Sequence, residues 1–186
     1  MILTLALGIG LIVGLVWAKW KGQPYQLPRL RYTWLAIIAF LPQFFVSYFE
    51  RTQALTPDRL AAIAIVTSQG LLFLFAWFNR HLPGMLGLII GIVLNFTVIV
   101  TNGGFMPISP QTAERVIGKE RFSSYELGGR IGDKDILLPS HETRLELLAD
   151  RFLLPEEFPY QVAFSMGDIF VAVGACWMLA YQKPIS

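Results

Sequence analysis

The chain has 186 residues, of which 54% are hydrophobic, and its mean hydropathy is +0.54. This composition is too apolar for an ordinary soluble domain of this length. The formal net charge is +2, but ionisable residues are sparse within 1–100 and concentrated within 114–157. The single cysteine, Cys176, excludes a disulfide within the chain, and only two histidines accompany it, which argues against a multi-ligand transition-metal site.

Five apolar stretches are predicted to form membrane-spanning helices. A helix needs about 20 apolar residues to cross about 30 Å of hydrocarbon, and each stretch reaches or approaches this length without an internal Lys or Arg. The stretches are residues 2–18, 32–49, 60–78, 83–100 and 162–181. The sequence therefore predicts an all-α membrane protein, a single integral membrane domain over 1–186, with five transmembrane helices and a partly helical loop between the fourth and fifth.

The distribution of positive residues predicts the orientation, because cytoplasmic connections carry an excess of Lys and Arg. Six of them lie in the connections after the first and third stretches and in the tail: Lys19, Lys21, Arg29, Arg31, Arg80 and Lys183. We therefore expect the N-terminus outside, the C-terminus in the cytoplasm and loop 101–161 outside. This loop has ten acids and seven Lys or Arg, which does not favour nucleic acid as a partner.

Two helices are predicted within the loop. In the first, Ser109 is the N-cap, Pro110 occupies the first turn and Gly118 ends the helix. The second is amphipathic and covers PSHETRLELLADRFLLP, residues 139–155, with Ser140 as its cap. The segment ELGGRIGDKD between them is predicted to be a turn-rich connector.

Two pairs of glycines mark faces for close helix packing. Gly10 and Gly14 are four residues apart in the first stretch, and Gly87 and Gly91 have the same spacing in the fourth. This spacing lets two helix backbones approach closely. The partner is either a second copy of the chain or another helix of the same chain, and we favour the latter.

The start of the last stretch, FSMGDIFVAVG, carries an acid within an apolar run. Ser165 and Asp168 have the S-x-x-D spacing of a helix capping box. Alternatively, Asp168 belongs to an outward-facing polar pocket, because polar groups in a bilayer must find partners. The same groups also suit a structural hydrogen-bond network that joins loop and helices. The candidate residues for the pocket or network are Gln43, Asn95, Asn102, Asp150, Ser165 and Asp168.

Evidence for an enzyme is weak. The sequence contains no serine or cysteine nucleophile motif, no HExxH and no phosphate-binding loop. His141 would serve as a base for lipid chemistry only if the fold brought it close to Asp150 or Asp168. His81, alone at the end of the third stretch, is interpreted as an interface residue rather than a ligand of haem or chlorin. No cofactor is identified.

Three motifs carry a resemblance to a known family. NGGFMPIS follows the fourth stretch, TRLELLADRFLLP comes next, and FSMGDIFVAVG opens the fifth. In this order the sequence resembles, over nearly the whole chain, an uncharacterised family of small bacterial polytopic inner-membrane proteins, a domain-of-unknown-function family. The resemblance implies a bacterial inner-membrane location but no activity. It also implies that the marked residues lie on the outer face: Asn102, Met106, Pro107, Asp150, Pro155, Ser165, Gly167 and Asp168.

Three hypotheses for the function follow. The leading one is a non-enzymatic membrane protein, a scaffold or an accessory subunit of a larger complex, with the lipid bilayer and other membrane proteins as partners. The alternative is a protein that binds or transports a small solute or ion in the pocket around Asp168. The third is a membrane enzyme that acts on lipid.

Overall fold

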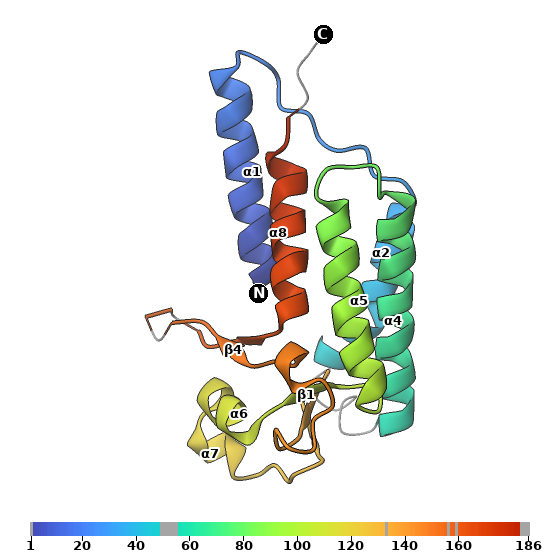
Figure 1. Cartoon of the computed structure of the whole chain (residues 1–186), viewed down its shortest axis with the longest axis vertical. Helices are drawn as coiled ribbons and strands as arrows, with labels where there is room; N and C mark the ends of the chain where they lie inside the picture. Colours follow the sequence, from blue (N-terminus) through green and yellow to red (C-terminus); the bar gives the residue numbers. More distant parts are fainter. Residues whose placement is uncertain (1, 49–55, 133, 156, 159, 183–186) are drawn as a thin grey trace.

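The computed structural model describes residues 2–48, 56–132, 134–155, 157–158 and 160–182, and it describes side chains there except those of 42–48. Five apolar helices lie side by side, and the segment between the last two folds into a small domain at one end of them (Figure 1). These bundle helices are α1 (Ile2–Trp20), α2 (Thr33–Tyr48), α4 (Asp58–Phe78), α5 (Met85–Thr101) and α8 (Met166–Ala180). Each coincides with a predicted apolar stretch.

The structure is mostly helical, but only some of its helices have the length of a membrane span. Among the described residues, α1 and α4 are long and apolar enough to cross a membrane, by length and composition. Helices α2, α5 and α8 are apolar but have 16, 17 and 15 residues. At about 1.5 Å per residue they are shorter than the roughly 30 Å of a hydrocarbon core.

The bundle helices form a single open row. Their main contacts follow the order α1–α8–α5–α4–α2, and Figure 1 shows α1, α8, α5 and α4 across the view with α2 partly behind α4. Helices α8, α5 and α4 therefore have a neighbour on each side. The helices at the two ends of the row, α1 and α2, each pack mainly on one neighbour. Within the α2–α4 pair, the buried hydroxyl of Ser68 donates to the carbonyl of Ala39, at 2.6 Å.

Helix α8 packs closely on both of its neighbours because glycines line the contacts. A Cβ added at Gly10 of α1 would lie 2.5 Å from the backbone oxygen of Cys176, and one at Gly14 would meet the backbone of Leu179. On the other side, Gly87 and Gly91 of α5 lie against the backbone of α8. All four glycines singled out by their spacing thus lie at contacts within the chain.

The segment between α5 and α8, which we call the loop domain, combines short helices with short strands. The helical elements are α6 (Pro110–Ile117), α7 (Lys119–Phe122) and the 3₁₀ turn η1 (Glu146–Leu148). The strands are β1 (Met106–Ile108), β2 (Arg130–Ile131), β3 (Asp135–Leu137), β4 (Phe152–Leu153) and β5 (Ala163–Phe164). One sheet has the order β1-β3-β2, with β1 and β3 parallel, and β4 pairs with β5 in antiparallel fashion.

The first predicted loop helix is confirmed and the second is wrong. Ser109 caps α6, because its hydroxyl accepts the Thr112 N–H at 3.2 Å, and the helix ends at Gly118. Residues 139–155 instead form turns, a three-residue 3₁₀ segment and a strand. Leu145 adopts φ +57°, in the left-handed region that a right-handed helix excludes.

Pairing with distant strands explains this second outcome. The Asp150 N–H donates to the Pro107 carbonyl of β1, and Phe152 pairs with Phe164 of β5 and stacks on its ring at 5.8 Å. Both partners lie outside residues 139–155, so the amphipathic pattern of this segment does not reveal them. The expectation of an all-α fold is therefore wrong for the loop domain. The connector 126–135 is turn-rich as expected, but it also contains β2 and the start of β3.

The loop domain is attached to the bundle by a shared apolar core. That core joins the ends of α4 and α5 to β1 and the segment before β4; its buried members are Ala61, Ile65, Val98, Ile99, Phe105, Met106 and Ala149. The domain also has a small core of its own, formed by Ile108, Ala113, Ile131 and Leu137. The loop domain is thus a folded unit fixed to one end of the helices.

Candidate functional site

The opening of α8 is a complete capping box. The Ser165 hydroxyl accepts the Asp168 N–H at 3.0 Å, and the Asp168 Oδ2 accepts the Ser165 N–H at 3.1 Å. The prediction from the S-x-x-D spacing is confirmed. A carboxylate in the first turn also interacts favourably with the positive end of the helix dipole. Asp168 therefore has a local reason to occupy this position in an apolar segment.

Asn95 of α5 joins this cap to the neighbouring helix. Its Nδ2 donates to Asp168 Oδ1 at 2.8 Å, and its Oδ1 accepts from the Ser165 hydroxyl at 2.8 Å. Ser165 is fully buried and Asn95 is nearly so. Gly167 lies directly against the Asn95 side chain, so a larger residue there would displace it. The three polar side chains that the sequence places at similar depth thus form one hydrogen-bond network, and both Asp168 oxygens have a protein partner.

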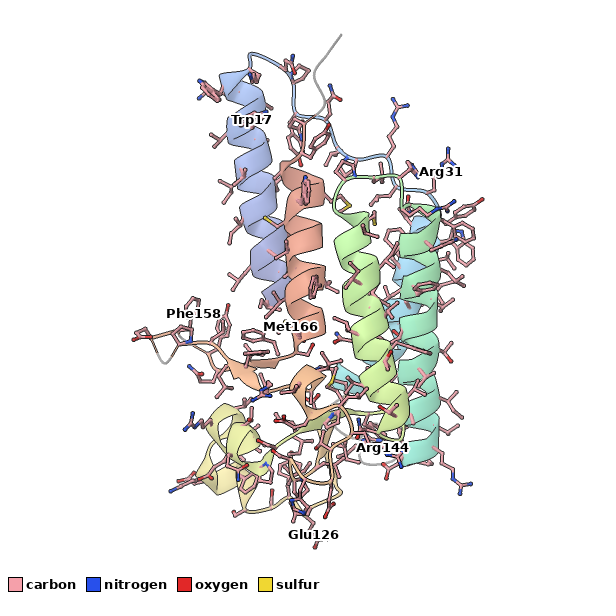
Figure 2. All side chains as sticks on the ribbon, in the orientation of Figure 1. Trp17, Arg31, Glu126, Arg144, Phe158 and Met166 are labelled. Atoms are coloured by element: carbon pink, nitrogen blue, oxygen red, sulfur yellow. The ribbon has the colours of Figure 1, made fainter. Side chains whose placement is uncertain are left out.

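Asn102 joins the bundle to the loop domain at a second point. Its Nδ2 donates to the Arg144 carbonyl at 2.9 Å, and its Oδ1 accepts the Arg144 N–H at 3.0 Å. This pair of bonds fixes the backbone just before η1 to the end of α5, where Figure 2 labels Arg144. Gln43 lies in α2, and its side chain is outside the described residues.

Asp150 belongs to a cluster of charged side chains beside this network. Lys134 Nζ lies 2.6 Å from Asp150 Oδ2 and 3.2 Å from Asp135 Oδ1. The Asp150 side chain is 1% exposed and that of Asp135 is 23% exposed. Oδ1 of each aspartate is buried and has no hydrogen-bond partner among the described residues; for Asp135 the contact with Lys134 lacks hydrogen-bond alignment. One lysine thus faces two acids.

Burial is the largest influence on the pKa values of the two carboxyl groups in this cluster. It raises the pKa of the Asp135 carboxyl from 3.8 to about 7, against the opposing charge of Lys134. Burial also raises the pKa of Asp150; Lys134 opposes this shift and the charge of Asp168 reinforces it. For Lys134 burial disfavours the ammonium form, but the nearby carboxylates outweigh it and raise its pKa well above 10.5. Near neutral pH, the cluster therefore holds a charged lysine and a carboxyl that can gain or lose a proton.

The chemistry open to this cluster is binding of a proton. Among the described residues, no group of three or more His, Cys, Asp or Glu side chains could hold a metal ion. Sequence reasoning included Asp150 but missed Lys134 and Asp135, which lie in the stretch read as a connector. The sequence GDKD, in which acids flank Lys134, was the available signal for a charged cluster. It does not indicate that this lysine pairs with Asp150.

The two histidines have surface positions. The His141 side chain is 79% exposed, and its Nε2 lies 3.5 Å from Glu142. In the part of the chain that the structure describes, His141 therefore pairs with its neighbour in sequence, whereas Asp150 pairs with Lys134. His81 is exposed just after α4.

Comparison with known proteins gives the chain a family. The model of a family of unknown function, DUF5317, matches residues 28–180, and the chain belongs to this family. The resemblance drawn from the motifs, that of a domain-of-unknown-function family, is thereby confirmed. Comparisons with curated proteins and with solved structures give no match.

Proposed function

We propose that the chain is a non-enzymatic integral protein of a bacterial inner membrane and serves as an accessory subunit or scaffold in a larger membrane complex. In this proposal all five bundle helices cross the membrane. The N-terminus and the loop domain lie outside, and the C-terminus lies in the cytoplasm. The alternating direction of the five helices supports this arrangement, because the N-terminus and the loop domain share one end of the bundle (Figure 1).

The observation that carries the proposal is the open row of helices. Within the described ranges, a row one helix thick leaves α1 and α2 with one main neighbour each. Large apolar side chains of α1 are exposed, among them Ile9, Ile12 and Val16, which share one face of the helix and are 55 to 63% exposed. Lipid is able to cover such faces. A row without a closed core also has two edges, at α1 and at α2, where neighbouring membrane proteins can pack.

Purification from the native membrane in a mild detergent tests this function. The molar mass of the protein part, measured by light scattering during gel filtration, should exceed the 20.9 kDa of one chain. Mass spectrometry should identify a second membrane protein in fixed ratio. A monodisperse single chain, obtained under conditions that preserve other complexes of the same membrane, would refute the accessory role.

A second candidate function is ion binding by the loop domain, with the proton as the ion. Among the described residues, the buried Oδ1 of Asp150 has no hydrogen-bond partner and the buried Oδ1 of Asp135 has only its ion pair with Lys134. These two oxygens favour the loop domain over a pocket centred on Asp168, whose two oxygens already accept hydrogen bonds. Carbon-13 NMR of aspartate carboxyl groups should show one group titrating near neutral pH and absent in Asp135→Asn. If all aspartates titrate near pH 4, this candidate fails.

A further inference from the structure

In the described parts of the chain, the charged side chains at the end of the bundle opposite the loop domain are all basic. All thirteen acids of the sequence lie within 50–58 and 114–168. At the opposite end the described structure has five basic residues: Lys19, Lys21, Arg29, Arg31 and Arg80. Figure 2 shows Trp17 and Arg31 at this end. Lys21 Nζ lies 5.5 Å from the ring centre of Trp17, and the Arg80 guanidinium lies 4.9 Å from that of Trp77.

A cavity of about 510 Å³ opens at this end. The connection between α1 and α2 forms one wall, with Leu27 and Arg29, and the turn between α4 and α5 contributes Leu82 and Pro83. The C-terminal end of α8 adds Met178. The volume lies within the range of about 300–1,000 Å³ typical of small-molecule sites. The lining is mostly apolar, and its polar residues are Gln26, Arg29 and Tyr181.

The connection that forms this wall is fixed on both sides of the cavity. Towards α8, the Tyr25 hydroxyl donates to the Leu179 carbonyl at 2.9 Å. Towards α4, the side chain of Asn79 accepts the Arg31 N–H at 2.7 Å and donates to the Arg31 carbonyl at 2.8 Å. Asn79 itself is fully buried. The cavity is therefore a formed site, because hydrogen bonds hold the connection on either side of it, at Tyr25 and at Arg31.

We infer that this cavity binds the headgroup of an anionic phospholipid from the leaflet next to it. This inference rests on the proposed membrane location, in which this end lies at the cytoplasmic leaflet. Arg29 forms no ion pair or hydrogen bond with the described residues, so its charge is available to a phosphate. The apolar walls suit the upper part of the acyl chains. Basic pockets between helices on the cytoplasmic side are suited to anionic headgroups.

Lipid titration of the purified chain tests this site. The protein in detergent is titrated with phosphatidylglycerol or phosphatidylcholine, and bound lipids are counted by native mass spectrometry. We expect one tightly held phosphatidylglycerol per chain and at least about tenfold weaker binding in Arg29→Gln, with partial recovery in Arg29→Lys. Equal retention of the two lipids by the wild-type chain would overturn the inference.

Two control variants distinguish lipid binding in the cavity from nonspecific electrostatic attraction of the lipid to this end of the bundle. Arg31→Gln removes a charge at the same end outside the cavity lining and should weaken binding by no more than about fivefold, the effect of one basic residue near an anionic surface. Arg59→Gln, near the other end of α4, should leave binding unchanged. Equal losses in Arg29→Gln and Arg31→Gln would show diffuse attraction and overturn the site.

The source of the anion and the role of partners are tested separately. Inorganic phosphate should not raise the thermal midpoint of the lipid-free protein; a rise that depends on Arg29 would identify a soluble phosphate as the ligand and overturn the lipid assignment. A partner-free chain that still binds phosphatidylglycerol through Arg29 would refute the accessory role alone. A stable complex without lipid preference would refute the lipid site alone.

Discussion

Substitution of Gly174 by alanine tests whether close backbone packing of α8 holds the row together. An added Cβ at Gly174 would lie 2.6 Å from the Gly84 carbonyl oxygen and 2.7 Å from the Leu88 N. Real Cβ atoms essentially never approach another heavy atom to under 3.0 Å. The start of α5 and the middle of α8 must therefore separate by at least the 0.4 Å between 2.6 and 3.0 Å.

The energetic cost of this separation follows from packing. A radial gap of about 0.5 Å already forfeits roughly a quarter of the dispersion energy of the atoms that lose contact. Overpacking of a well-packed interface typically costs about 1–3 kcal/mol. The glycine-to-alanine change itself favours a helix by up to about 1 kcal/mol and offsets part of the loss. We expect Gly174→Ala to lower the free energy of unfolding by about 1–2 kcal/mol.

Gly70→Ala is the matched control, because a Cβ on this glycine in the middle of α4 meets no atom of the described residues within 4 Å. It should leave stability unchanged or raise it by up to about 1 kcal/mol. The assay is unfolding of each variant in the same mixed micelles by a denaturing detergent, followed by circular dichroism. If Gly174→Ala is as stable as Gly70→Ala, close packing between α5 and α8 does not stabilise the bundle and the reasoning is refuted.

Three further predictions concern the polar contacts. Asn95→Ala should destabilise the protein by about 1–3 kcal/mol in the same assay, since it leaves buried polar groups of the α8 cap unpaired, whereas Thr97→Val on the exposed face of α5 should change stability by less than about 0.5 kcal/mol. The pKa of Asp135 is about 7 in the folded chain and 3.8 in the unfolded chain, so the folded chain binds the proton more tightly. The stabilisation that results is complete below about pH 4 and is lost as the pH rises to about 7. The thermal midpoint should fall over this interval, and Asp135→Asn should flatten the dependence; an unchanged slope would contradict the shift. Asn79→Ala removes three hydrogen bonds, and hydrogen exchange at the Arg31 amide should become faster while exchange within α8 does not change.

Local sequence signals determined the positions of the bundle helices and two of the helix caps. The positions of the five apolar helices follow from their composition, and their ends lie within four residues of the predicted ones. The cap of α6 at Ser109 and the capping box at Ser165 follow from residue types three or fewer positions apart. These features are predictable because each depends on contacts that a single turn of helix makes with itself.

The tertiary structure decided which elements meet. The position of α8 between α1 and α5 depends on which glycine surfaces fit together, and a spacing such as that of Gly87 and Gly91 does not identify its partner. Residues 139–155 have the amphipathic pattern of a helix, but strand pairing with segments outside this range gives them another structure. Asn95 finds Asp168 73 residues further along, and Lys134 finds Asp150 16 residues further along. Such contacts become favourable only when the whole fold has formed, because they must offset the entropy lost when the chain between the two residues is closed into a loop. No local sequence pattern therefore reveals them.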